Sequence, residues 1–244
     1  MPLSYKLHAE LAKEHGGEKR WGYRTLTAAS LSAKGQIHKG NPGIVEGVVG
    51  KEDGEKIPKV GAGRVKFSKK DVPEDLDWFD GDSITGYSEM GGPSTTAQVH
   101  PYQFTTSMAD LAVEAGAKVI LGKVTAIDYT GTHGVKGVTY EDKETKHIHS
   151  LPATDVVLAA GPWTGHVFPE APITGSKAHS VVIEADVSPY AIFSEIQLPK
   201  ELVKAARRKH VMSMSPEMYA RPDGTVYACG QLFRSPCLRY ANKI

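Results

Sequence analysis

The stretch His100–Trp163 decides the fold of this chain, and it reads HPYQFTTSMADLAVEAGAKVILGKVTAIDYTGTHGVKGVTYEDKETKHIHSLPATDVVLAAGPW. Apolar residues at helical spacing predict a helix over Tyr102–Ala115, which Gly116 ends. A β-branched strand is predicted over Lys118–Asp128, followed by a polar β-meander and a second strand over Thr154–Ala160. That last run is apolar without alternation, as in a parallel sheet covered on both faces. The order indicates the second half of a dinucleotide-binding α/β domain.

The chain before this stretch contains one clear helix and several loops. Leucines at helical spacing predict a helix from Leu3 that ends near Gly16 and Gly17. Trp21–Ala33 has the aromatic and β-branched character of a strand. A long exposed loop rich in Gly, Lys, Pro and Glu is predicted over 35–63, and a second Gly-rich loop over Tyr87–Thr96.

The chain after this stretch is predicted to form strands and one short helix. A strand lies within Ile173–Asp186, and a basic helix is predicted over Leu198–Lys209. Met218–Arg221 and Thr225–Cys229 then form a hairpin around the turn Pro222-Asp223-Gly224.

Composition bounds the function. Apolar residues make up 40% and charged residues 23% of the 244 residues, as in an ordinary globular protein. Lys plus Arg is 29 against 28 for Asp plus Glu, so no overall field favours nucleic acid or an acidic membrane. The chain has two cysteines and no apolar run long enough to cross a bilayer. We expect a soluble, cytoplasmic protein; its oligomeric state is left open.

Gly161 is the first residue with a chemical interpretation. It follows the second apolar strand, where open α/β sheets bind their ligands and where a residue without Cβ lets a bulky group approach. The alternative is that Gly161-Pro162 is only a turn, and these residues alone favour that alternative.

The whole stretch resembles the FAD-dependent oxidoreductases typified by D-amino-acid oxidase, sarcosine oxidase and glycine oxidase. The resemblance extends over residues 2 to about 230. In detail the sequence is most similar to a group of fungal FAD oxidoreductases. The segments that carry it are LSYKLHAELAKEHGG near Leu3, HPYQFTTSM at His100, ATDVVLAAGPWT at Ala153 and YARPDGTVYACG at Tyr219.

The resemblance implies FAD as the cofactor, together with residues that line it. The two cysteines do not lie where a flavin attachment is expected, which favours a non-covalent cofactor. Val124 matches the position whose backbone meets the adenine half of FAD, and Ala160, Gly161 and Trp163 match the turn on the flavin side. Val124 would also be an ordinary buried strand residue. Two interpretations of Trp163 stay open: its ring covers the sheet, or its ring contacts the flavin.

The resemblance also implies a substrate domain, with Tyr219, Arg221 and His179 as candidate catalytic residues. Tyr219 and Arg221 match the strand that faces the flavin, where a guanidinium could hold a substrate carboxylate. The favoured alternative is that Arg221 caps the turn through Asp223, and His179 has a structural alternative too. No metal site is predicted, because His147 and His149 lack further ligands.

The reaction implied by the resemblance is oxidation of the C–N bond of an amine or amino acid. A hydride leaves the carbon next to nitrogen, the imine hydrolyses, and oxygen reoxidises the flavin. A small-molecule amine or amino acid is therefore the expected partner, and no nucleic acid is expected.

Two departures from the family pattern affect this expectation. The Gly-x-Gly-x-x-Gly turn that binds the pyrophosphate is missing before Leu3, and the tail Gln231–Ile244 is off-pattern. We therefore expect a chain truncated at both ends that binds FAD poorly and is unstable alone, because missing central strands expose sheet edges. The alternative function is a non-catalytic fragment or binding protein that has lost its cofactor.

These considerations predict an α/β fold of the two-domain α+β type. It combines a partial Rossmann-like FAD-binding domain carrying a β-meander with an antiparallel-sheet substrate domain. The predicted segments are 1–20 and 98–172 for the FAD-binding domain, 21–97 and 173–229 for the substrate domain, and 230–244 for the tail.

Overall fold

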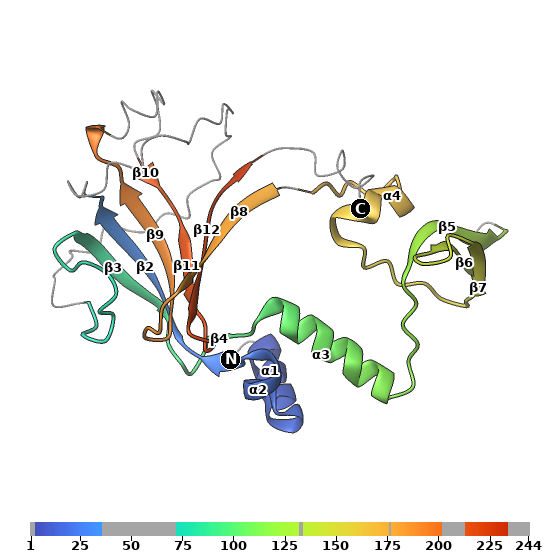
Figure 1. Cartoon of the computed structure of the whole chain (residues 1–244), viewed down its shortest axis with the longest axis horizontal. Helices are drawn as coiled ribbons and strands as arrows, with labels where there is room; N and C mark the ends of the chain where they lie inside the picture. The colour runs from blue at the N-terminus through green and yellow to red at the C-terminus, as the bar shows by residue number, and fades with distance from the viewer. Residues whose placement is uncertain (1–2, 36–71, 132–133, 176, 202–212, 234–244) are drawn as a thin grey trace. The chain divides into compact units, whose positions relative to one another are not determined.

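A computed structural model describes residues 3–35, 72–131, 134–175, 177–201 and 213–233 (Figure 1). Three predicted segments lie mostly outside the described residues: the helix over Leu198–Lys209, the loop over 35–63 and the tail. The chain divides into two compact units, Met1–Met108 with Ala178–Leu232, and Ala109–Lys177 with Phe233–Ile244. Each unit is described by itself below.

The first unit is built on a mixed sheet with the strand order β3-β2-β9-β11-β12-β8, and β10 pairs with β9 (Figure 1). Strands β2 and β9 are parallel, and β3, β10 and β11 join their neighbours in antiparallel pairs. Its strands are β2 (Thr27–Lys34), β3 (Ile84–Gly91), β8 (Lys177–Glu184), β9 (Tyr190–Gln197), β10 (Ser213–Met214), β11 (Glu217–Ala220) and β12 (Thr225–Phe233).

Two predictions about this sheet were wrong in detail. Trp21–Ala33 is not one strand, because helix α2 (Gly17–Trp21) ends at Trp21 and the short β1 (Arg24–Thr25) precedes β2. β1 pairs with β4 (Ala97–Gln98) instead. The predicted loop over Tyr87–Thr96 begins as strand, because residues up to Gly91 pair with β2. Tertiary pairing therefore overrides the weak strand propensity of this Gly-rich segment.

One face of the large sheet forms the hydrophobic core. Leu31 and Ile192 are fully buried on neighbouring strands, and Leu76 closes the core from the loop before β3. Trp78 and Phe79 pack against this core with ring centroids 4.8 Å apart, and Trp78 Nε1 donates a hydrogen bond to Ser188 Oγ. The alternation of apolar and polar residues along β2 thus sets which face is buried.

Two helices at the start of the chain pack near the beginning of α3 (Pro101–Glu114). Helix α1 covers Leu3–His15, as the leucine spacing predicts. Trp21 is completely buried, and its ring meets Phe104 edge-on with centroids 5.7 Å apart. The prediction of a helix over Tyr102–Ala115 is confirmed to within one residue at each end.

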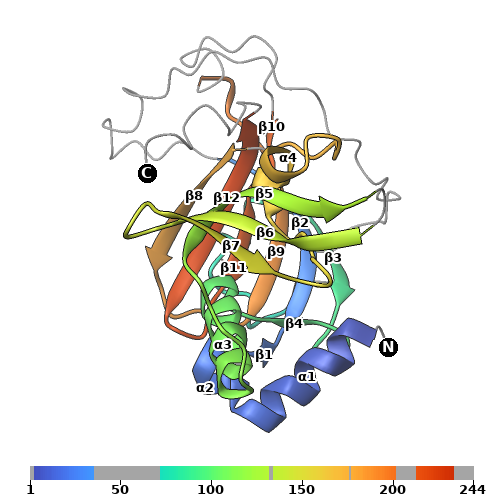
Figure 2. The same ribbon diagram turned by 90° about the vertical axis from the view of Figure 1, so that its right-hand side faces the viewer.

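The second unit contains an antiparallel meander of β5 (Gly122–Thr130), β6 (Gly134–Asp142) and β7 (Ile148–Pro152), seen side by side in Figure 2. The 3₁₀-helix η3 (Gly161–Trp163) and helix α4 (Thr164–Val167) follow, and α4 lies beside β5.

The two apolar strands predicted over Lys118–Asp128 and Thr154–Ala160 are not formed as predicted. The strand expected from Lys118 begins only at Gly122, and Thr154–Ala160 has no regular secondary structure. Val157 is 91% exposed, and Leu121 is 62% exposed. The physical reason is that neither run pairs with a strand among the described residues, and an apolar run becomes a buried strand only when a partner covers it.

The described residues include no helix that is long and apolar enough to span a membrane. The fold is a mixed α/β arrangement of several sheets and few helices, and the predicted fold class is confirmed.

Candidate functional site

The face of the large sheet opposite the core carries a cluster of polar and aromatic side chains. Strand register places Phe193, Glu217 and Cys229 in one row across β9, β11 and β12. The next row holds Tyr219 and Tyr227, which are direct partners in β11 and β12. Successive side chains of a strand alternate between faces, so these five side chains share the face that the core leaves open.

Glu217 is the acceptor at one end of the cluster. Tyr219 Oη donates a hydrogen bond of 2.6 Å to Glu217 Oε2, and the Cys229 thiol lies 3.9 Å from the same oxygen. Burial, the hydrogen bond to Glu217 and its negative charge raise the pKa of Tyr219. Burial also raises the pKa of the Cys229 thiol, with Glu217 adding to the effect. Both groups are therefore protonated donors at neutral pH.

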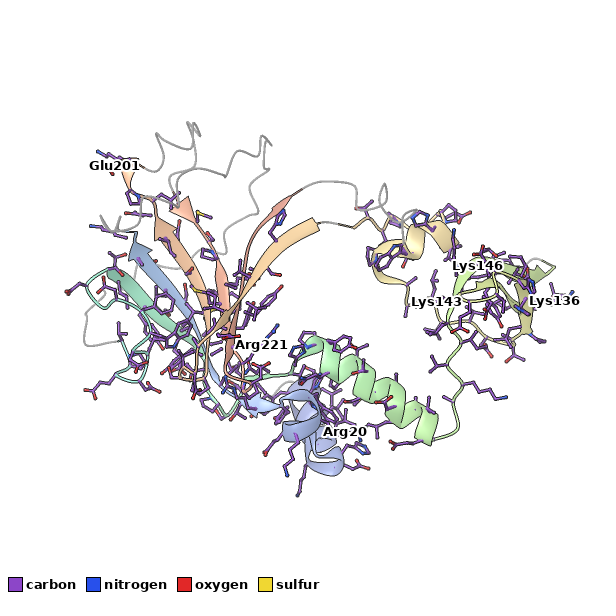
Figure 3. The ribbon with its side chains drawn as sticks, in the orientation of Figure 1. Arg20, Lys136, Lys143, Lys146, Glu201 and Arg221 are labelled. Carbon is purple, nitrogen blue, oxygen red and sulfur yellow. The ribbon has the colours of Figure 1, made fainter. Side chains whose placement is uncertain are left out.

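Aromatic rings connect Glu217 to a cation at the other end of the cluster. Phe193 meets Tyr219 edge-on at 6.0 Å between centroids, and Tyr219 and Tyr227 are 6.3 Å apart. The guanidinium carbon of Arg221 lies 4.7 Å from the centroid of the Tyr227 ring. Arg221 extends from the end of β11, as labelled in Figure 3. This distance is typical of a cation–π contact.

The turn after Arg221 is held by other groups. Asp223 Oδ1 accepts hydrogen bonds from the Thr225 hydroxyl at 2.6 Å and from the Thr225 amide at 3.1 Å. These bonds, the hydroxyl's first, lower the pKa of Asp223, and the charge of Arg221 adds to the shift. Arg221 thus acts on the turn through its charge on Asp223, while its guanidinium lies over the Tyr227 ring.

His179 lies on β8, the last strand of the sheet, and its side chain is exposed. The structure thus brings Tyr219 and Arg221 together on one face. Glu217 was missed in the sequence. The alternation Glu217-Met-Tyr219-Ala-Arg221 was the available signal, because it places three polar residues on one side of a strand.

The second unit contains the residues expected to line a cofactor. Val124 on β5 pairs with Tyr140 on β6, whose ring stacks with His149 at 5.5 Å. Val124 is 38% exposed, so it is not the buried strand residue of the alternative interpretation. Trp163 is 53% exposed.

Ala160 and Gly161 form a tight turn into η3. Trp163 donates its amide to the Ala160 carbonyl at 3.1 Å, and the Thr164 hydroxyl donates to the Gly161 carbonyl at 2.8 Å. Gly161 has φ +53°, and a Cβ built there meets no atom within 4 Å. The turn therefore needs glycine for its backbone conformation and leaves open space where a ligand can approach closely.

This open turn fits one wall of a flavin site. Gly161 and the exposed Trp163 offer close backbone approach and an aromatic surface, which are what a planar ring system requires. The sequence has no Gly-x-Gly-x-x-Gly turn for a pyrophosphate. The residues present therefore fit the ring-bearing part of FAD, and the phosphates have no matching motif.

Other features of the first unit do not join the site. A cavity of about 350 Å³ is lined by Glu18, Tyr23, Arg24, Thr25 and Pro222. Arg24 is held there as a structural group: its Nη2 donates to the Ala220 carbonyl at 2.7 Å, and burial lowers its pKa. No group of three or more His, Cys, Asp or Glu side chains that could hold a metal ion is found within the described ranges.

Comparison with known proteins identifies the family. A model of the FAD dependent oxidoreductase family, DAO, matches residues 78–235 of the chain. A Saccharomyces cerevisiae protein described as "Putative oxidoreductase TDA3" is 28% identical over 95% of this chain and 62% of its own length. A Schizosaccharomyces pombe protein described as "Putative oxidoreductase C1F5.03c" is 28% identical over 96% of this chain and 54% of its own length. The chain thus spans little more than half the length of these relatives.

Among solved structures, an iminodiacetate oxidase from Chelativorans is similar to this chain. It has a TM-score of 0.49 and 16% sequence identity, and the match covers 96% of this chain and 58% of that protein.

Proposed function

Because the chain belongs to the FAD dependent oxidoreductase family, we propose that it acts in the oxidation of a C–N bond of an amino acid or amine. The observation that carries this proposal is the open sheet face, where Arg221 and Tyr219 lie on one strand with a carboxylate beside them. Such a face can bind a small, charged organic molecule through both signs of charge.

The residues of the first unit would bind and orient the substrate. The Arg221 guanidinium offers a planar set of donors that matches a carboxylate. Tyr219 supplies a ring surface, and its hydroxyl remains protonated because its pKa is raised by burial and by Glu217. We assign these residues to positioning, and His179 remains a weaker candidate because it is exposed on β8.

The residues of the second unit would hold the cofactor's rings. Gly161 allows close approach, Ala160 and Trp163 flank it, and Val124 contributes backbone from β5. When bound, FAD supplies the capacity to accept a hydride from the carbon next to nitrogen. The protein's own contribution is binding, orientation and exclusion of water.

The proposal is tested by measuring peroxide release. The purified chain is incubated with FAD and, separately, with D-amino acids, glycine, N-methyl amino acids and ε-aminohexanoate. Where the folded chain holds the added flavin, we expect release with at least one of these classes and a loss of about tenfold or more in Arg221→Met, because a charge-assisted pair to the substrate is removed. Glu184→Gln, an exposed change on β8, is the control.

The contrary result is equally informative. A folded chain that binds flavin and releases no peroxide with any class would overturn the proposal of C–N oxidation. A folded chain that binds no flavin would instead favour the alternative of a binding protein without the cofactor.

A further inference from the structure

The open face of the large sheet has opposite charges at its two ends. We call this set the bipolar strip. Its contacts run from the Arg221 guanidinium to Tyr227, from Tyr227 to Tyr219, and from Tyr219 to Glu217, with Phe193 at the edge of Tyr219. A cation stands at one end, a carboxylate at the other, and aromatic rings lie between them.

The spacing of the two charges is set by the strand. Glu217 and Arg221 are four residues apart, which is about 13 Å along a β-strand at roughly 3.3 Å per residue. The Arg221 guanidinium leans back over Tyr227, the partner of Tyr219, so the separation of the charged groups is shorter than this. It remains longer than the separation of amine and carboxylate in an α-amino acid, where a single carbon joins them.

The hydrogen bonds described for Glu217 use one of its two carboxylate oxygens. Both donors described for it, Tyr219 and Cys229, converge on Oε2. Within the described part of the chain Oε1 accepts no hydrogen bond, and it is absent from the buried unpaired atoms found there. The Glu217 carboxylate beside the rings of Phe193 and Tyr219 is a site for an organic ammonium group, because aromatic faces and carboxylates both attract cations.

We propose that the bipolar strip binds an amphoteric amine whose ammonium group and carboxylate are separated by an apolar spacer. Glu217 takes the ammonium, Arg221 takes the carboxylate, and the rings of Tyr219 and Tyr227 cover the spacer. The inference names the substrate class of the site proposed above and rests on that proposed function for its role in catalysis. The binding itself needs no cofactor.

Calorimetric titration of the whole chain without FAD tests this inference. The ligands are ε-aminohexanoate, hexylamine, hexanoate and glycine. We expect ε-aminohexanoate to bind best, because it alone reaches both ends, and glycine to bind least. In Glu217→Gln the affinity for ε-aminohexanoate and hexylamine falls about tenfold or more, and that for hexanoate is unchanged. In Arg221→Met the affinity for ε-aminohexanoate and hexanoate falls instead, and the affinity for hexylamine is unchanged.

Controls separate binding from folding. Glu184→Gln, an exposed carboxylate on the same sheet, should leave all affinities unchanged. Circular dichroism of each variant shows that the sheet is intact.

The inference is overturned if the folded chain binds none of the amines. It is also overturned if Glu217→Gln weakens hexylamine no more than Glu184→Gln does. Because these measurements omit FAD and turnover, they fail separately from the peroxide test of the proposed function.

Discussion

The two units of this chain differ in how they treat apolar residues. In the first unit Leu31 is completely buried between neighbouring strands, whereas in the second unit Leu121 is 62% exposed and Val157 is 91% exposed. Among the described residues, every buried hydrophobic residue lies in the first unit. The same kind of side chain therefore stabilises one unit and contributes little to the other.

The difference teaches that an apolar pattern shows which residues need to be covered, and not what covers them. Covering an apolar surface stabilises a fold by about 25 cal/mol per Å². In the first unit the sheet and the Leu76–Phe79 segment supply the cover from within the chain. In the second unit the meander is paired strand to strand, but the runs that flank it are not.

The largest expected difference in stability comes from replacing one leucine by alanine in each unit. Leu31→Ala removes a fully buried side chain and should lower the free energy of unfolding by about 2–5 kcal/mol. Leu121→Ala should change it by less than about 0.5 kcal/mol, because this side chain is largely exposed. Urea unfolding followed by tryptophan fluorescence measures both, and equal losses would contradict the comparison.

A polar contact within the first unit has the next largest effect. Arg24 Nη2 and Gln98 Nε2 both donate to the Ala220 carbonyl, at 2.7 and 2.8 Å, and so join β1 and β4 to the end of β11. Arg24→Met keeps the apolar stem and loses the hydrogen bond, so unfolding should become easier by about 1–3 kcal/mol.

The control for this change is Arg20→Met on helix α2, labelled in Figure 3. No hydrogen bond or ion pair of the Arg20 side chain is found within the described ranges, so its loss should cost less than about 0.5 kcal/mol. Thermal unfolding would sink the interpretation if both variants lost the same stability.

In the second unit the sharper test concerns binding. Gly161 and Gly131 both have positive φ, +53° and +61°, and neither has an atom within 4 Å of a built Cβ. Alanine at either position should cost a similar 1–2 kcal/mol, roughly the penalty of a left-handed conformation for an L-residue. Gly161→Ala should also weaken flavin binding, because its Cβ occupies the open space beside Trp163.

Flavin fluorescence titrations of the two alanine variants measure this difference. Gly131→Ala shares the backbone strain but lies in the turn after β5, so it separates strain from obstruction. Equal affinities for flavin in the two variants would remove Gly161 from the cofactor wall.

Much of the fold could be predicted from local pattern. The helix from Leu3, the helix near Pro101 and the hairpin around Pro222-Asp223-Gly224 depend on helical spacing, glycine stops and turn residues, and all three are present. Two predictions were wrong for one reason: Tyr87–Gly91 was predicted as loop and is strand, and Thr154–Ala160 was predicted as strand and has no regular structure. Strand formation depends on a partner that is distant in sequence.

The candidate site shows the same limit. Tyr219 and Arg221 could be assigned to one face because they alternate on one strand. The contact of Tyr219 with Glu217 was available from that alternation and was missed. The positions of Phe193 and Cys229 beside Glu217 were not available, because they depend on the register of β9 and β12 against β11.

The smallest expected effect comes from removing the hydrogen bond between Tyr219 and Glu217 on the open face of the large sheet. These two side chains are partly exposed, as many side chains of the second unit are. Tyr219→Phe removes the hydrogen bond to Glu217 and should cost under about 1 kcal/mol at neutral pH. The raised pKa of Tyr219 means that the fold favours the protonated phenol. Its stabilisation is fully present below the unfolded pKa of about 10 and is lost as the pH rises towards the folded value.

Thermal unfolding between neutral pH and pH values above about 10 should therefore show the wild type losing its advantage over Tyr219→Phe. Tyr190 also has a raised pKa, from burial and its bond to Asp75, so both proteins should still lose stability in alkali. Only the difference in stability between the wild type and Tyr219→Phe therefore reports on Tyr219. Tyr129→Phe, on an exposed residue of β5, is the control. If the gap stays constant across this range, the Tyr219 hydroxyl is not held by Glu217, and the carboxylate end of the bipolar strip is not organised as described.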